Sequence, residues 1–187
     1  MGLMSGLGHN GGPSVEAGVA WRTHCWTKAR ADLLPHLPIE VLRGRVKRAR
    51  ELGLEYRTYA SVRAATGHDV IGFLFSTNAL RLLVPLAVMP VDRAEKLAAI
   101  VDCGRVALVQ APLTIAQVQG MAAIDEAQVA PLPLASWAVV RDSLRAALGK
   151  RPGDGMLLVG DTALEREWCA AGRLAGYLPA ERYFVRQ

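Results

Sequence analysis

From residue 69 onward, short apolar runs alternate with stretches in which apolar residues recur every three or four positions. Such runs are typical of buried strands, and such stretches are typical of amphipathic helices. Alternation of this kind predicts a parallel sheet with helices on both faces, because each crossover between parallel strands carries a helix. The expected strands are DVIGFLFST (69–77), GRVALVQAP (104–112), AQVAPLP (127–133), GMLLVGD (155–161) and RYFV (182–185).

The segment before residue 68 has a different pattern, which predicts a small helical subdomain. Ser14 can cap a first helix, Pro38 suits the first turn of a second, and a third is expected near 56–66. Residues 1–13 are mostly Gly and small polar residues, so we expect a flexible tail there. The expected organisation is a tail (1–13), a basic helical subdomain (14–67) and an α/β domain (68–187), in which a parallel sheet is flanked by helices.

The composition narrows the class of protein. The chain of 187 residues suits one domain with a small appendage, and no apolar run reaches the roughly 20 residues of a membrane-spanning helix. The N-terminus lacks the pattern of a secretion signal. Three widely spaced cysteines form neither a disulfide framework nor a zinc pattern. We therefore expect a cytoplasmic protein with no membrane partner.

Positive charge is concentrated in one segment. Residues 21–67 contain ten Lys and Arg against four Asp and Glu, whereas the net charge of the whole chain is only +5. A concentrated positive field favours nucleic acid or an acidic protein surface as the partner. The alternative is that these side chains only form a solvated helix face.

Within this segment, RARELGLEYRTYASVRAATG (48–67) fits the spacing of helix-turn-helix DNA-binding motifs. A small residue, Ala49, lets two helices approach, Gly53 takes the turn, and Tyr59 and Val62 bury the second helix. Any two packed helices joined by Leu-Gly-Leu give a similar pattern, so the structural alternative stays open. The residues expected to contact nucleic acid are Arg43, Lys47 and Arg50 for backbone phosphates, and Arg57, Thr58, Ser61 and Arg63 for bases or phosphates.

Polar residues follow two of the expected strands. Ser76, Thr77 and Asn78 end the first strand and can offer hydroxyl and amide groups to a ligand. In LLVGDTALEREW (157–168), Asp161 ends another strand and Glu165 lies one helical turn later. Two such carboxylates can hold Mg²⁺ at the carboxyl edge of a sheet. The alternative is that Asp161 caps the following helix.

The stretch ALGKRPGDGMLLVGDTALEREWCAAGRLAG (147–176) resembles the last motif of haloacid dehalogenase-like phosphohydrolases, and the resemblance extends over residues 69–176. It implies a magnesium-dependent site in which Asp161 and Glu165 are the metal-binding acids and Lys150 matches the family's lysine. The chain departs from the family at the first strand. Phe75 stands in place of the nucleophilic Asp and Thr77 in place of the second Asp, so the family reaction is not expected.

These patterns favour a non-catalytic binding protein without a cofactor, associated with nucleic acid or with an acidic protein surface through its basic segment. Under this interpretation no residue is catalytic. One alternative is a divergent haloacid dehalogenase-like hydrolase that uses Mg²⁺ at Asp161 and Glu165. Another is a structural or assembly factor that acts through its surface alone.

Overall fold

The computed structural model describes residues 37–84 and 88–185. The tail expected at 1–13 and the helix expected from Ser14 lie outside the described residues. The chain divides into two units, Met1–Leu42 and Arg43–Gln187. The described part of the first unit contains the start of helix α2 (Ile39–Glu51). The sheet and all the other described helices belong to the second unit.

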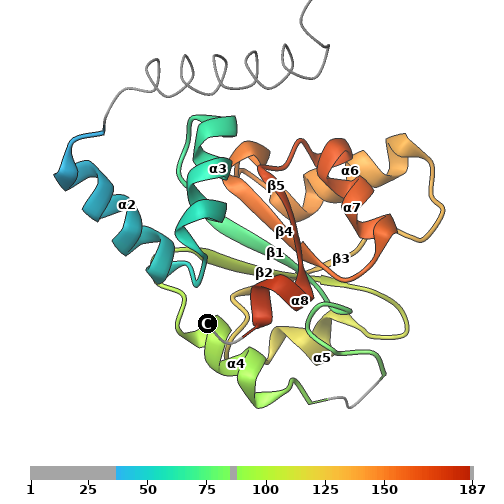
Figure 1. Ribbon diagram of the computed structural model, residues 1–187. Coiled ribbons are helices and arrows are strands. Elements are labelled where there is room, and N and C mark those ends of the chain that lie inside the picture. The colour runs from blue at the N-terminus through green and yellow to red at the C-terminus, as the bar shows by residue number, and fades with distance from the viewer. Residues whose placement is uncertain (1–36, 85–87, 186–187) are drawn as a thin grey trace, which may run out of the picture. The chain divides into compact units, whose positions relative to one another are not determined.

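Five parallel strands form one sheet in the order β3-β2-β1-β4-β5, with helices on both faces (Figure 1). The α/β class expected from the sequence is confirmed. The strands are β1 (Gly72–Ser76), β2 (Gly104–Val109), β3 (Glu126–Val129), β4 (Met156–Gly160) and β5 (Gly176–Pro179). The remaining helices are α3 (Tyr56–Thr66), α4 (Val91–Ala98), α5 (Ile115–Gln119), α6 (Trp137–Leu148), the 3-10 turn η1 (Gly153–Gly155), α7 (Ala163–Gly172) and α8 (Ala180–Phe184).

Strand β1 lies at the centre of the sheet and supplies both core layers. Its five residues are all buried, and alternate side chains point to opposite faces. Phe73 and Phe75 pack in the layer with Tyr183, whereas Leu74 packs with Leu144 in the layer under α6 and α7. Burial on both faces explains why the strands of this sheet are nearly continuous apolar runs.

The fifth strand is not where the sequence pattern placed it. The prediction of a strand at RYFV (182–185) is wrong, because Tyr183 and Phe184 are buried in helix α8. The fifth strand of the sheet is instead β5, which pairs with β4 at the edge of the sheet. Its Gly176 and Pro179 are residues that strand propensity disfavours. Pro179 has no backbone N–H to donate. An edge strand tolerates this, because only one of its sides pairs with another strand.

The segment from α2 to α3 packs into the same core as the sheet. Gly53 has a φ of 64°, the left-handed conformation that the tight turn between the two helices requires. Leu52, Leu54 and Tyr59 are buried in the core layer that contains Phe73. The unit that contains the sheet therefore begins at Arg43, before the boundary expected at residue 67.

No helix within residues 37–84 and 88–185 is long and apolar enough to cross a membrane. The cytoplasmic location stays a prediction.

Candidate functional site

The strand order reverses next to β1. The chain leaves β1 towards β2 on one side, whereas β4 lies on the other side and leads to β5. Loops that leave neighbouring strands in opposite directions open a crevice outside the carboxyl ends of those strands, where ligands bind in sheets of this kind. Three polar residues that follow β1, β2 and β4 meet here: Asn78, Gln110 and Glu165.

The centre of this edge is the carboxylate of Glu165, whose side chain is fully buried. Its Oε1 accepts hydrogen bonds from Asn78 Nδ2 (3.0 Å) and Gln110 Nε2 (3.1 Å). Its Oε2 accepts from the backbone N–H groups of Asp161 (2.6 Å) and Thr162 (2.9 Å). Four N–H donors thus offset the cost of burying the charge. They also fix the orientation of both side-chain amides.

Helix α7 is capped by Thr162, so the capping role considered for Asp161 is wrong. The Thr162 hydroxyl accepts from Glu165 N (3.2 Å) while Glu165 reaches back to Thr162 N, which is a capping box. The sequence Thr-Ala-Leu-Glu, with Thr and Glu three positions apart, is typical of such a capping box. The Asp161 carboxylate instead accepts from Arg81 Nη1 at 2.7 Å.

The three residues expected to bind a ligand after β1 differ in accessibility. The Ser76 hydroxyl is buried and accepts from Ala79 N (3.1 Å), which holds the turn. The buried Thr77 hydroxyl donates to Gln110 Oε1 (3.3 Å) and accepts from Gln110 N (3.2 Å). Asn78 is partly exposed and lines a cavity. Of the three, Asn78 is therefore placed to meet a ligand, and Ser76 and Thr77 hold the loop around it.

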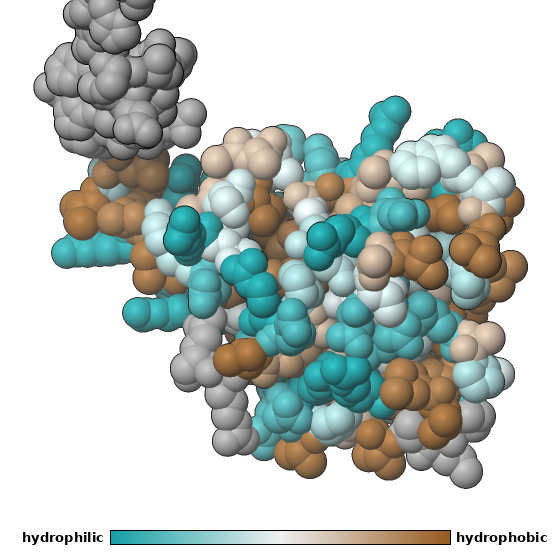
Figure 2. Space-filling model, turned by 45° about the vertical axis from the view of Figure 1, so that its right-hand side comes forward, coloured by the Kyte–Doolittle hydropathy of each residue, from teal (hydrophilic) through white to brown (hydrophobic). Residues whose placement is uncertain are grey.

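Two adjoining cavities lie along this edge, with volumes of about 440 Å³ and 670 Å³. They share part of their wall, which includes Asn78 and Gln110. The other walls are mainly apolar, and several large apolar side chains near them are exposed to solvent. Exposed hydrophobic residues are visible in brown towards the right of Figure 2. The exposed apolar residues of the two cavities are Ile115, Val129, Leu132, Leu134, Trp137 and Leu164.

The expected magnesium site stays a prediction, and its two acids already have partners. Both oxygens of Glu165 accept two N–H groups each, and Asp161 pairs with Arg81. A cation would have to displace these donors. Within the described part of the chain, no three His, Cys, Asp or Glu side chains are grouped as metal ligands. Phe75, at the nucleophile position of the resembled family, is fully buried against Tyr183.

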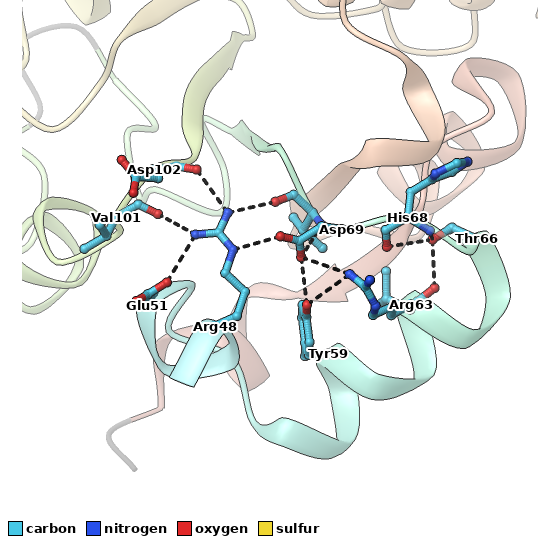
Figure 3. A network of polar contacts seen from close by, with 11 residues as sticks. Arg48, Glu51, Tyr59, Arg63, Thr66, His68, Asp69, Val101 and Asp102 are labelled. Atoms are coloured by element: carbon cyan, nitrogen blue, oxygen red, sulfur yellow. Dashed lines mark hydrogen bonds and ion pairs between the residues drawn. The ribbon is translucent and has the colours of Figure 1, made fainter. Parts of the chain in front are cut away.

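The basic segment contains an arginine with a structural role that the sequence does not reveal. The Arg48 guanidinium donates to Asp69 Oδ2 (3.0 Å) and to the backbone carbonyls of Val70, Val101 and Asp102 (Figure 3). Asp69 also accepts from the Tyr59 hydroxyl at 2.8 Å. Burial alone raises the pKa of Asp69, but the Tyr59 hydroxyl and the Arg48 charge outweigh it and lower that pKa. The carboxylate therefore stays charged in the folded protein.

The residues expected to contact nucleic acid differ in how exposed they are and in which contacts they make within the protein. Arg63 Nη1 lies 3.9 Å from Asp69 Oδ1. The Ser61 hydroxyl donates to the backbone carbonyl of Thr58 within α3. Lys47 pairs with Glu51 at 3.7 Å, but its side chain is 81% exposed. The remaining members of the set, Arg43, Arg50 and Arg57, are exposed.

Comparison of the chain with models of protein families, with characterised proteins and with solved structures found no match. The resemblance to haloacid dehalogenase-like proteins stays a prediction.

Proposed function

We propose that this chain is a non-catalytic binding protein that takes a neutral organic ligand in the crevice at the carboxyl ends of β1 and β2. The ligand has an apolar body and one amide-like edge. One observation carries the proposal: a buried carboxylate, Glu165, fixes two side-chain amides, Asn78 and Gln110, in the wall that two cavities share.

The hydrogen bonds define which groups the wall offers. Asn78 donates through Nδ2 to Glu165, so its carbonyl oxygen Oδ1 points away from that carboxylate. Among the described residues, Oδ1 accepts no hydrogen bond. Gln110 directs Oε1 to the Thr77 hydroxyl and Nε2 to Glu165, and each amide nitrogen keeps a second N–H. The acceptor Oδ1 of Asn78 and the remaining N–H donors of the two side chains match the N–H and C=O groups at the edge of a ligand amide.

The other walls suit the rest of such a ligand. Cavities of this size bury small organic molecules, mostly through apolar and aromatic side chains with a few fixed polar groups. Trp137, Leu132 and Leu164 supply the apolar contacts. A binding role is supported by the state of the reactive groups, since the hydroxyls of Ser76 and Thr77 are already bonded. Burial also raises the pKa of the Cys169 thiol to about 12.

A set of matched small probes tests this proposal on the full chain labelled with ¹⁵N. We expect benzamide to shift the side-chain NH₂ resonances of Asn78 and Gln110. Methyl benzoate lacks the N–H donor and should bind about tenfold more weakly, because Asn78 Oδ1 then lies desolvated without a partner.

A cavity-filling variant locates the binding. Ala135→Trp fills the smaller cavity, whose wall contains Ala135, and should abolish the shifts. Ala138→Trp places the same side chain at an exposed position of α6 outside the cavity lining and should leave them unchanged. Absence of shifts in the parent chain, or equal shifts in Ala135→Trp, contradicts the proposal.

A second candidate is binding of nucleic acid, or of an acidic protein surface, through the basic side chains of α2 and α3. The observation that favours it is the exposure of Lys47, Arg50 and Arg57. Each phosphate neutralised by a basic side chain releases counterions, so affinity for a labelled DNA duplex should fall steeply with salt.

Removal of the basic residues tests this candidate. Replacing Arg43, Lys47 and Arg50 together by Met should reduce the salt slope by up to about three, roughly one for each phosphate contact that is lost. A triple replacement of Arg141, Arg145 and Lys150, in and after α6, is the control for net charge. Binding that does not depend on salt, or no binding at low salt, contradicts this candidate.

A further inference from the structure

An arginine in the first turn of α4 has an incomplete set of hydrogen bonds. Arg93 Nη1 is buried and, within the described part of the chain, has no hydrogen-bond partner. Its guanidinium carbon lies 4.5 Å from the centre of the Phe184 ring, so one face of the group is covered by an aromatic side chain. A buried N–H group without a partner is costly, and in native proteins such a group often indicates an ion or water that is part of the site.

The fold places Arg93 at the same edge as Asp161. Phe184, on which Arg93 stacks, packs against Phe75 near the end of β1, with ring centres 6.3 Å apart. Phe75 pairs with Val159, two residues before Asp161. The charges of Arg81, Asp92 and Asp161 all influence the pKa of Arg93, although burial is the main cause that lowers it. The ring contacts and the strand register place Arg93 at the same edge of the sheet as the Arg81–Asp161 ion pair.

Arg81 is held in an unusual conformation at this point. Its φ is 58°, a left-handed value that costs energy for a residue with a side chain. It directs its guanidinium to Asp161 at 2.7 Å, while its side chain remains 46% exposed. A ligand therefore has access to Arg81 and its partner from solvent.

We propose that Arg81 and Arg93 form a binding site for an oxyanion, a phosphate or carboxylate group. The Asp161 carboxylate holds Arg81 in place until the ligand arrives. The oxyanion then replaces Asp161 at Arg81 and accepts hydrogen bonds from the N–H groups of Arg93, whose planar fork suits two oxygen atoms at once. Arg81, Arg93 and Asp161 do not line the two cavities, so this site is separate from the amide-binding crevice.

Thermal melting of the full chain with inorganic phosphate and with acetate, at an ionic strength matched by sodium chloride, tests the site. We expect at least one of the anions at millimolar concentration to raise Tm by about 2–4 °C, by mass action on the folded state. An effect of phosphate alone identifies a phosphate ligand, and an effect of acetate alone identifies a carboxylate ligand.

Three variants separate this site from a general effect of anions. Arg93→Met keeps an apolar contact with Phe184 and removes a buried N–H group that has no partner among the described residues. It should abolish the anion effect without lowering the Tm measured in chloride. Arg93→Lys keeps the charge but loses the fork, and should weaken anion binding about tenfold. Asp161→Asn removes the competing carboxylate and should tighten binding. Arg141→Met, at an exposed position of α6, is the matched control.

The outcomes decide the proposal. Stabilisation by an anion that persists in Arg93→Met, or no stabilisation of the parent chain by either anion, overturns it. If Arg93→Met does not fold, the comparison of Arg93→Lys with the parent decides, and equal affinities overturn the proposal.

Discussion

Glu165→Leu should lower the free energy of unfolding by about 3–5 kcal/mol, because it leaves four N–H donors without their acceptor, among them two backbone groups at the start of α7. The Leu side chain has a similar size, so the loss comes from the hydrogen bonds rather than from a cavity. Chemical denaturation followed by circular dichroism measures the change.

Two further variants isolate the role of this carboxylate. Glu165→Gln keeps one acceptor oxygen but points its NH₂ group at two other donors. Its free energy of unfolding should therefore lie between those of the parent chain and Glu165→Leu. Glu167→Leu, at an exposed position of the same helix, should change stability by less than about 0.5 kcal/mol. If Glu165→Leu is as stable as Glu167→Leu, the carboxylate does not hold this edge together.

Arg48→Met should lower the free energy of unfolding by about 2–4 kcal/mol, because it removes the Arg48 charge from the Asp69 carboxylate and leaves three backbone carbonyls without the Arg48 donor. The side chain of Arg48 is only 18% exposed, so water replaces these bonds poorly. Urea denaturation near neutral pH measures the loss while Asp69 is charged.

The neighbouring basic residue provides the control for Arg48. Arg50 lies on the exposed side of the same helix, and Arg50→Met should change the free energy of unfolding by less than about 0.5 kcal/mol. Equal losses in the two variants contradict the assignment of Arg48 as the residue that joins α2 to the strands.

Local patterns predicted the central strands well, because a strand buried on both faces must be apolar along its whole length. The same rule failed for β5. This strand is at the edge, where Gly176 and Pro179 are tolerated and the buried aromatic residues of the segment belong to the helix that follows.

The candidate site was predictable only where its signal is local. The spacing of Thr162 and Glu165 indicates a capping box, which is a contact between residues three positions apart. The contact between Asn78 and Glu165 joins residues 87 positions apart, and that between Arg48 and Val101 spans 53 positions. Sequence periodicity does not reveal which distant polar groups meet. For this reason Gln110, Arg81 and Arg93 were missed.

The four hydrogen bonds to Glu165 also connect the two sides of the crevice. The amides of Asn78 and Gln110 and the first turn of α7 share one carboxylate, so neither side can rearrange while the other stays in place. Fraying of that turn frees the Asn78 amide to rotate and leaves the Gln110 amide held by the Thr77 hydroxyl alone. If the crevice binds a ligand as proposed, we expect local unfolding at the start of α7 to set how long its wall keeps the arrangement that binds.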